Sequence, residues 1–349
     1  MNKLLSPSLR WASTIASLMG ALFFFTSCKE DPQSANGPVQ TFSPNGSAAN
    51  PALTYAAGVY QNNNLVGSAI FVADSDANHQ TKITQTFSNG VGAPSWSPTG
   101  SSICFHQAAP SGPDTIRAID VSVNSHGTPV GSNYRTIYGF PSTSVFISPG
   151  ASVSWSSTTS MGQIAYCTSN GSGITGLWVI SQSGGTPTNI FSVNTATWTF
   201  QTALNYPTWC PDDSKLAVVR ADSFNIHGAA STIMIFNTST WTYVDSVKVP
   251  GKVTAIEWSR TGSNKLAFGL VMHGGANVDT LNYCDATFGS TRSNNGIILS
   301  GGVTWSPNNS SLLYTGTTTG GAFACRKLTA FSGSNSVLTT AFRDVKWKR

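Results

Sequence analysis

The stretch PSWSPTGSSICF, residues 94–105, recurs along the chain and decides the expected fold. Related stretches are VSWSSTTSMGQIAYC at 153–167, PTWCPDDSKLAVV at 207–219, IEWSRTGSNKLAF at 256–268, VTWSPNNSSLLY at 303–314 and the closing VKWKR at 345–349. Units of about 40 to 45 residues are typical of four-stranded propeller blades. The tryptophans, which lie 59, 54, 49, 47 and 42 residues apart, are Trp96, Trp155, Trp209, Trp258, Trp305 and Trp347.

Each full copy reads as strand, tight turn and strand, because a turn-forming cluster such as 97–100 separates the tryptophan from an apolar run. The second strands align in two columns that lie two residues apart. Side chains alternate along a strand, so both columns face the same way and should pack against a neighbouring sheet. The columns are Ile103, Ile164, Leu216, Leu266 and Leu312, and Phe105, Tyr166, Val218, Phe268 and Tyr314.

A further apolar strand occurs six times, first at 70–74, but the N-terminal unit has no tryptophan segment of its own. Trp347 can supply that strand by lying beside Leu53–Tyr55, and this pairing would remove the free edges of an open sheet. We therefore predict that residues 51–349 form an all-β propeller. It has six four-stranded antiparallel blades and is closed by the C-terminal strand joining the N-terminal blade.

These repeats resemble the TolB-type propeller repeat, a relative of the WD-repeat class, over nearly all of residues 52–349. Trp155 is followed by Ser-Ser and Trp258 by Ser-Arg, where the other full copies with serine have Ser-Pro. The resemblance implies a propeller that binds envelope proteins through one face. Fold alone does not give the function.

Residues 1–27 are expected to be an export signal, because Lys3 and Arg10 precede an uncharged run that ends in small residues. The ending Phe25-Thr26-Ser27-Cys28 resembles the lipobox of bacterial lipoproteins, although phenylalanine replaces the usual leucine. That resemblance implies acylation of Cys28, which would anchor the chain to a membrane. An ordinary secretory signal, in which Cys28 is incidental, is the alternative.

Residues 28–50 are rich in Pro, Gly, Ser and Asn and read as a flexible linker. The run Lys29-Glu30-Asp31 resembles the surface-export tag of Bacteroidota lipoproteins, and a residue other than Asp after the cysteine is usual in outer-membrane lipoproteins. We expect an outer-membrane lipoprotein that is exposed to the periplasm or the cell surface. Removing Lys3 and Arg10 leaves 17 basic and 14 acidic residues, a balance that does not suggest nucleic acid, and we expect a monomer.

Three histidines, His106, His227 and His273, fall in or beside the loop after a blade's second strand and would share one face of the propeller. They are candidate binding residues and could form a metal or proton-transfer site, although loops are simply where polar residues gather. No two histidines have the spacing of a metal pair, and no metal or cofactor is predicted. No G-x-S-x-G elbow and no privileged pair of carboxylates is present.

Two tryptophans lie outside the repeat and are candidate binding residues. Trp198 lies in a long stretch between blades and Trp241 lies in a turn between outer strands. An exposed indole could stack on a sugar or anchor a protein partner, or it could instead cover the edge of a blade. Of the five cysteines after Cys28, Cys104 replaces a small residue of the repeat and is expected to be a buried thiol.

Two functions remain open from the sequence. The first is a lipid-anchored envelope protein that presents a propeller face to a protein, peptide or glycan. The second is an envelope enzyme that acts on a polysaccharide or lactone at the central channel. Histidines clustered with a carboxylate at the channel would favour the enzyme, whereas a channel lined by Ser, Thr and backbone would favour binding.

Overall fold

The computed structural model describes residues 51–62, 64–92, 94–109, 113–142, 145–147, 153–170, 174–194, 204–225, 228–260, 265–271, 279–285, 292–298, 302–317, 323–329, 335–340 and 343–348. They all lie in one compact unit, Phe42–Arg349. Within the described residues the chain forms strands and no helix, so none of them offers a helix that could span a bilayer. The predicted signal, Cys28 and the linker lie outside these residues.

Five sheets are antiparallel and have four strands each, listed here from the inner strand outward. The first three are β25 (Arg343–Trp347), β1 (Leu53–Gln61), β2 (Asn64–Ala73) and β3 (Thr81–Lys82); β4 (Ser95–Trp96), β5 (Ser102–Gln107), β6 (Thr115–Val123) and β7 (Pro129–Gly139); and β13 (Leu204–Trp209), β14 (Lys215–Asn225), β15 (Gly228–Asn237) and β16 (Thr242–Val249). The other two are β17 (Lys252–Trp258), β18 (Lys265–Val271), β19 (Asp279–Asp285) and β20 (Arg292–Ile298); and β21 (Val303–Trp305), β22 (Ser311–Thr317), β23 (Phe323–Thr329) and β24 (Asn335–Thr340).

The remaining sheet has five strands, so the prediction of four strands in every blade is wrong there. Its strands are β8 (Val145–Ile147), β9 (Ser154–Trp155), β10 (Gln163–Asn170), β11 (Ile174–Ser181) and β12 (Thr188–Asn194). Both β8 and β9 pair with β10, at opposite ends of that strand. The inner strand is thus split in two, and the sequence between the halves contains Pro149 and Gly150, residues that interrupt strands.

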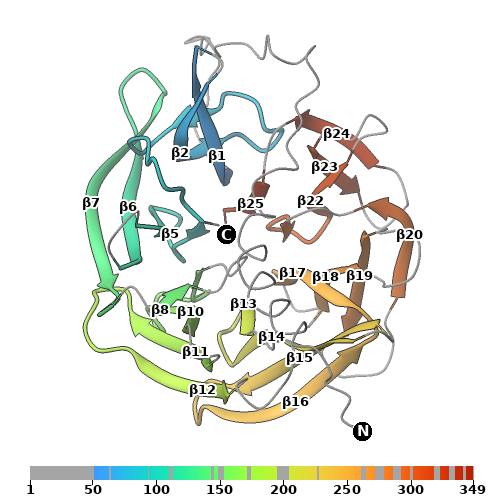
Figure 1. Cartoon of the computed structure of the whole chain (residues 1–349). Helices are drawn as coiled ribbons and strands as arrows, with labels where there is room; N and C mark the ends of the chain where they lie inside the picture. Colours follow the sequence, from blue (N-terminus) through green and yellow to red (C-terminus); the bar gives the residue numbers. More distant parts are fainter. Residues whose placement is uncertain are drawn as a thin grey trace, which may run out of the picture. The chain divides into compact units, whose positions relative to one another are not determined.

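The two ends of the described chain meet in one sheet, as the sequence predicted. Leu53 lies opposite Trp347 and Thr54 opposite Lys346, and the N–H of Lys348 donates to the carbonyl oxygen of Ala52. Figure 1 shows β25 beside β1, with the inner strands of the sheets gathered around the centre of a propeller arrangement. The first sheet therefore contains residues from both ends of the described chain.

The core follows the two predicted columns, all of whose members are at most 1% exposed. The six repeat tryptophans are buried as well, at 1–5% exposure. Burial of large apolar side chains is the main source of stability in such a domain. The tryptophans therefore serve packing between the sheets, which is the role that six equivalent copies suggested.

The residue after the tryptophan explains the tight turn of each copy. Its side chain accepts a hydrogen bond from the backbone N–H that opens the next strand. Ser97 accepts from Ser102 at 3.0 Å, and Cys210 accepts from Lys215 at 3.0 Å through its sulfur. Ser156, Ser259 and Ser306 accept equivalent bonds. This contact satisfies the backbone donor that follows the turn.

In three copies of the repeat, the indole of the tryptophan links its sheet to the sheet before it. The Nε1 groups of Trp209, Trp258 and Trp305 donate to the carbonyl oxygens of Ser154, Thr208 and Glu257, at 3.0, 3.0 and 3.2 Å. Each acceptor is the residue just before the preceding tryptophan. The repeat therefore carries its own connection between neighbouring sheets.

Candidate functional site

The residue just before each repeat tryptophan lies on an inner strand, where the sheets converge. Five of these residues line one pocket together with Trp96 of β4, Trp347 of β25 and Arg260, which follows β17. The pocket leaves room for about one water molecule. The six positions are Ser95, Ser154, Thr208, Glu257, Thr304 and Lys346, and of these only Thr304 does not line the pocket.

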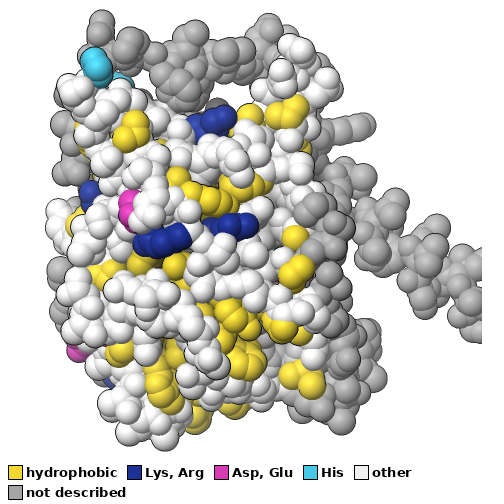
Figure 2. All heavy atoms as spheres, turned by 90° about the vertical axis from the view of Figure 1, so that its left-hand side faces the viewer, with side chains coloured by type: hydrophobic (Ala, Val, Ile, Leu, Met, Phe, Trp, Pro, Cys, Tyr) yellow, Lys and Arg dark blue, Asp and Glu magenta, His cyan; other side chains and the backbone are white. Residues whose placement is uncertain are grey.

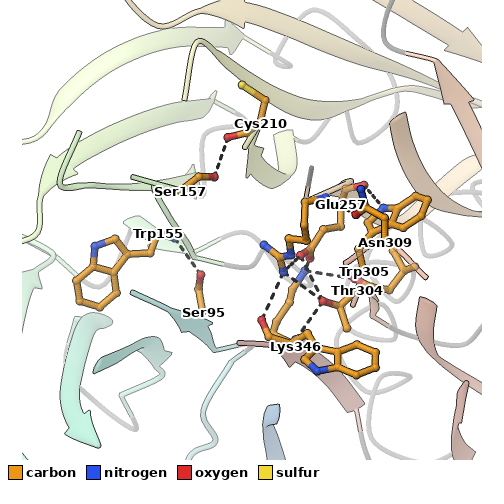
Figure 3. Close-up of polar contacts among 12 residues, drawn as sticks. Ser95, Trp155, Ser157, Cys210, Glu257, Thr304, Trp305, Asn309 and Lys346 are labelled. Atoms are coloured by element: carbon orange, nitrogen blue, oxygen red, sulfur yellow. Dashed lines mark hydrogen bonds and ion pairs between the residues drawn. The ribbon is translucent and has the colours of Figure 1, made fainter. Parts of the chain in front are cut away.

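Hydroxyl groups at this position hold neighbouring sheets together. The Ser95 hydroxyl accepts the backbone N–H of Trp155 at 3.0 Å, and the Thr304 hydroxyl accepts that of Trp347 at 3.1 Å (Figure 3). Both hydroxyl-bearing residues are buried. Each of these side chains therefore connects two sheets through a hydrogen bond to the backbone.

Two of the six positions are charged, and they meet in one cluster. The Glu257 carboxylate forms ion pairs with the guanidinium group of Arg260 and with the ammonium group of Lys346. Their side chains are 5%, 12% and 16% exposed, in that order. Figure 3 shows Glu257 and Lys346 turned toward each other next to Thr304. Removing one member of such a buried group leaves an uncompensated charge, which is strongly destabilising.

A second contact fixes the turn that carries Arg260. Its backbone N–H donates to the Asn309 side chain of the next sheet at 2.6 Å. Asp213 occupies the equivalent place, four residues after Trp209, and accepts the N–H groups of Ser157 and Thr158 at 2.5 and 2.7 Å. Asn309 and Asp213 both have a φ of 57°, a conformation that Asn and Asp tolerate. Their contacts hold neighbouring turns at fixed positions beside the pocket.

The pocket lining combines Ser and Thr residues with one group of paired charges. No histidine or cysteine is among its lining residues. Glu257 is its one acidic residue, and both carboxylate oxygens face cations. A carboxylate held in this way is a poor general base, because its charge is stabilised where it lies.

His106 lies apart from this cluster. It is near the end of β5 that points away from the turn after Trp96, since Ile103 is the residue opposite Trp96. Its Nε2 lies 2.9 Å from the Asp114 carboxylate, which also accepts the N–H groups of Ile147 and Ala109. Burial opposes ionisation of Asp114, but the hydrogen bond and charge of His106 and the two N–H groups outweigh it and lower the pKa.

The shared histidine face cannot be assembled from the described residues, because His227 and His273 lie outside them. Trp198 lies outside them as well. Trp241 is half-buried and its ring packs edge-on against Trp209 at 6.0 Å between centroids. This contact supports the reading of Trp241 as a cover over the core.

The described cysteines are buried, as expected for Cys104. Burial raises the pKa of the Cys325 thiol to about 12. Burial and a hydrogen bond to Asp212 raise that of Cys210 to about 11. Thiolate chemistry at neutral pH is therefore disfavoured at both. Among the residues that the structure describes, no three His, Cys, Asp or Glu side chains are grouped as metal ligands.

The cluster of Glu257, Arg260 and Lys346 was missed by reasoning from the sequence. Two signals were present in the repeat. The position before the tryptophan is Ser, Ser, Thr, Glu, Thr and Lys in turn, so that two of the six copies are charged. The position two residues after it is proline in three copies and arginine after Trp258. A charged residue at a repeat position that is uncharged in most other copies was the signal that could have revealed this cluster.

No protein-family model and no curated protein matches the sequence. Solved structures with a similar fold include TolB from Acinetobacter baumannii, with a TM-score of 0.62 and 14% identity, covering 85% of this chain and 66% of that one. The putative TolB from Agrobacterium tumefaciens gives 0.49 and 12%, covering 84% and 90%. A putative 6-phosphogluconolactonase from Bacteroides uniformis gives 0.47 and 10%, covering 84% and 83%. At these identities the likeness shows a propeller fold, and the structural neighbours include TolB-type propellers.

Proposed function

We propose that this chain is a lipid-anchored binding protein of the cell envelope. Its six sheets would form one closed ring that is tethered through Cys28 to the outer membrane, as in the lipoproteins of Bacteroidota. One face of the ring would engage a protein, peptide or glycan. The supporting facts are the TolB-like fold and the lipobox-like segment before Cys28.

The observation that carries this proposal is the chemistry of the central pocket. Its polar lining consists of Ser and Thr residues and one group of paired charges. Such a lining suits recognition of polar groups. His106 and Asp114 do not line it. The enzyme alternative therefore has no observation in its favour at the channel.

The proposed anchor sets the reach of the ring. The linker of residues 29–50 would have a root-mean-square span of about 26 Å if it behaves as a flexible coil. The described chain begins beside Trp347 and Lys348, which is the end of the inner strands where the pocket lies. A partner that engages this end must therefore lie within a few tens of ångströms of the membrane, on the order of that span.

Chemical crosslinking in the native envelope, followed by identification of the captured species, tests the binding function. A glycan panel and an assay of envelope polysaccharides and lactones should be run beside it. We expect capture of a defined partner and no turnover. Turnover of an envelope substrate by the purified chain, with no partner captured, would contradict the proposal.

The anchor is tested separately by Cys28→Ser. We expect this variant to appear in the soluble fraction, because the acyl chains that hold the protein in the membrane cannot be attached. Partition of the variant with membranes would contradict the lipid anchor while leaving the binding function open. Light scattering of the soluble variant would also test the expected monomer.

A further inference from the structure

We infer that the pocket lined by Glu257, Arg260 and Lys346, called the channel pocket below, binds a small anionic group such as a carboxylate. This inference rests on the proposed binding function, because the carboxylate would be presented by a peptide partner or would be free in solution. Four observations on the described residues carry it.

The first observation is the balance of charge. Two cationic side chains, Arg260 and Lys346, share the single carboxylate of Glu257. No other acidic side chain lines the pocket. All three groups are at least 84% buried, since their exposed fractions are 16% or less. An excess positive charge in a shielded place favours the binding of an anion, because the low dielectric strengthens the attraction.

The second observation is a pair of buried donors. The Nε of Arg260 and the indole Nε1 of Trp96 are buried without a hydrogen-bond partner, and both residues line the pocket. Trp96 is 2% exposed. The indole groups of Trp209, Trp258 and Trp305 bond the preceding sheet, and that of Trp155 donates to Gln182 of its own sheet at 3.2 Å, whereas the indole of Trp96 has no hydrogen-bond partner among the described residues. Unmet buried donors are costly, and an acceptor atom at this place would remove the cost.

The third observation is the rest of the lining. Ser95, Ser154 and Thr208 bring hydroxyl groups to the pocket from three other inner strands. Hydroxyl groups can turn to donate to an anion and need no charge to do so. A carboxylate placed here would meet charged donors on one side and neutral donors on the other.

The fourth observation is size. The pocket has room for about one water molecule, so a large anion would not enter as a whole. A formate-sized group at the end of an Asp or Glu side chain could enter only if the mouth opens. Arg260 and Lys346 are long side chains that can move to permit it, and Arg recognises planar carboxylates particularly well.

The test uses the full mature chain in detergent, with sodium formate as the probe and a bulky sulfonate salt to keep ionic strength constant. The thermal unfolding midpoint is measured as formate replaces sulfonate. We expect a rise in the wild type and the same rise in the control Lys82→Met, which removes one positive charge from an exposed strand. Lys346→Met should weaken the apparent formate affinity about tenfold, the scale of one lost charge-assisted hydrogen bond.

Glu257→Gln should change the apparent formate affinity in the opposite direction from Lys346→Met. It therefore keeps the test decisive if Lys346→Met does not fold. It removes the internal carboxylate that competes for both cations, so we expect a stronger dependence on formate than in the wild type. Equal dependence in the wild type, Lys346→Met and Glu257→Gln would overturn the inference, because the effect would then come from the general protein surface.

A second experiment distinguishes a carboxylate on a peptide partner from a free anion. Fluorescent hexapeptides that contain one Asp are compared with Asn versions by anisotropy, with formate as competitor. Binding that needs Asp and falls with added formate identifies a partner's side chain as the source. A formate effect without peptide binding identifies a free anion. Capture of an envelope partner tests the proposed function independently, so either can fail while the other stands.

Discussion

The two walls of the channel pocket are built from the same position of the repeat and differ in chemistry. Ser95, Ser154 and Thr208 form one wall, while Glu257 and Lys346 form the other. On the first wall the Ser95 hydroxyl and the Ser154 and Thr208 carbonyls bind the neighbouring sheets. On the second wall the Glu257 carbonyl binds the neighbouring sheet in the same way, and the charged side chains of Glu257 and Lys346 are buried together with that of Arg260. A position that repeats its chemistry serves the fold, and a position that departs from it marks a candidate site.

The outer side of the propeller offers no comparable cluster in the part that can be seen. Figure 2 shows the side that carries β7, where hydrophobic and basic side chains are interspersed and few acidic groups appear. Arg135 on β7 is paired with Asp120, and Arg117 lies over the ring of Tyr134 at 5.0 Å. Phe87 also stacks on that ring, with 6.1 Å between the ring centroids. The charged wall therefore remains the stronger candidate.

The largest effect is expected from ending the chain before Arg343, which removes β25 and with it half of the charged wall. The first sheet would lose its inner strand, and β1 would be left with an unpaired edge. We expect no cooperative thermal transition, or aggregation, in calorimetry. A transition within about 5 °C of the wild type would show that the ring does not depend on this strand.

Next in size is the loss of a repeat tryptophan. Trp258→Ala should lower the free energy of unfolding by about 3–5 kcal/mol, because the side chain is 1% exposed and its indole bonds the preceding sheet. Urea denaturation measures this change. Trp241→Ala is the control and should cost clearly less, because that indole is half-buried. Equal losses would refute the division between repeat and non-repeat tryptophans.

The walls themselves can be compared with one substitution on each. Glu257→Gln leaves Arg260 and Lys346 without their carboxylate and should cost about 3 kcal/mol in urea denaturation. Thr208→Val on the other wall keeps the backbone carbonyl that Trp258 uses and should cost less than about 1 kcal/mol. If Thr208→Val is as costly as Glu257→Gln, the two walls do not differ as described.

A smaller effect is expected at Asp114, away from both walls. Its pKa is lowered in the folded state, so ionised Asp114 stabilises the fold above the ordinary carboxyl pKa of 3.8, and this contribution is lost as pH falls through the folded pKa. Asp114→Asn should therefore be less stable than the wild type at neutral pH, with a gap that narrows at acidic pH. Urea denaturation at several pH values measures the gap. A gap that does not change with pH would contradict this assignment.

Much of the fold follows from the sequence, because the repeated tryptophans and the two apolar columns report burial directly. The pairing of Leu53 with Trp347 could also be predicted, because the N-terminal unit lacked a tryptophan strand and the C-terminal segment supplied one. The division of one inner strand into β8 and β9 was not predicted, because the repeat shows where a strand is expected and not where it divides.

The candidate site was harder to find for a physical reason. Glu257 and Lys346 are 89 residues apart and come from different sheets, so only the fold brings them together. The histidines drew attention because histidine often carries chemistry, yet His106 pairs with Asp114 outside the pocket. A comparison of every repeat position, polar as well as apolar, would have marked Glu257, Arg260 and Lys346.

The most direct test of the central claim is site-specific photocrosslinking in the native envelope from Pro307, an exposed residue of the turn next to Arg260. Tyr243, which is 51% exposed on the outer strand β16, is the matched position away from the pocket. We predict a defined crosslinked partner from Pro307 and none from Tyr243. Crosslinking from Tyr243 alone, or from neither position, would contradict a binding face at the channel pocket.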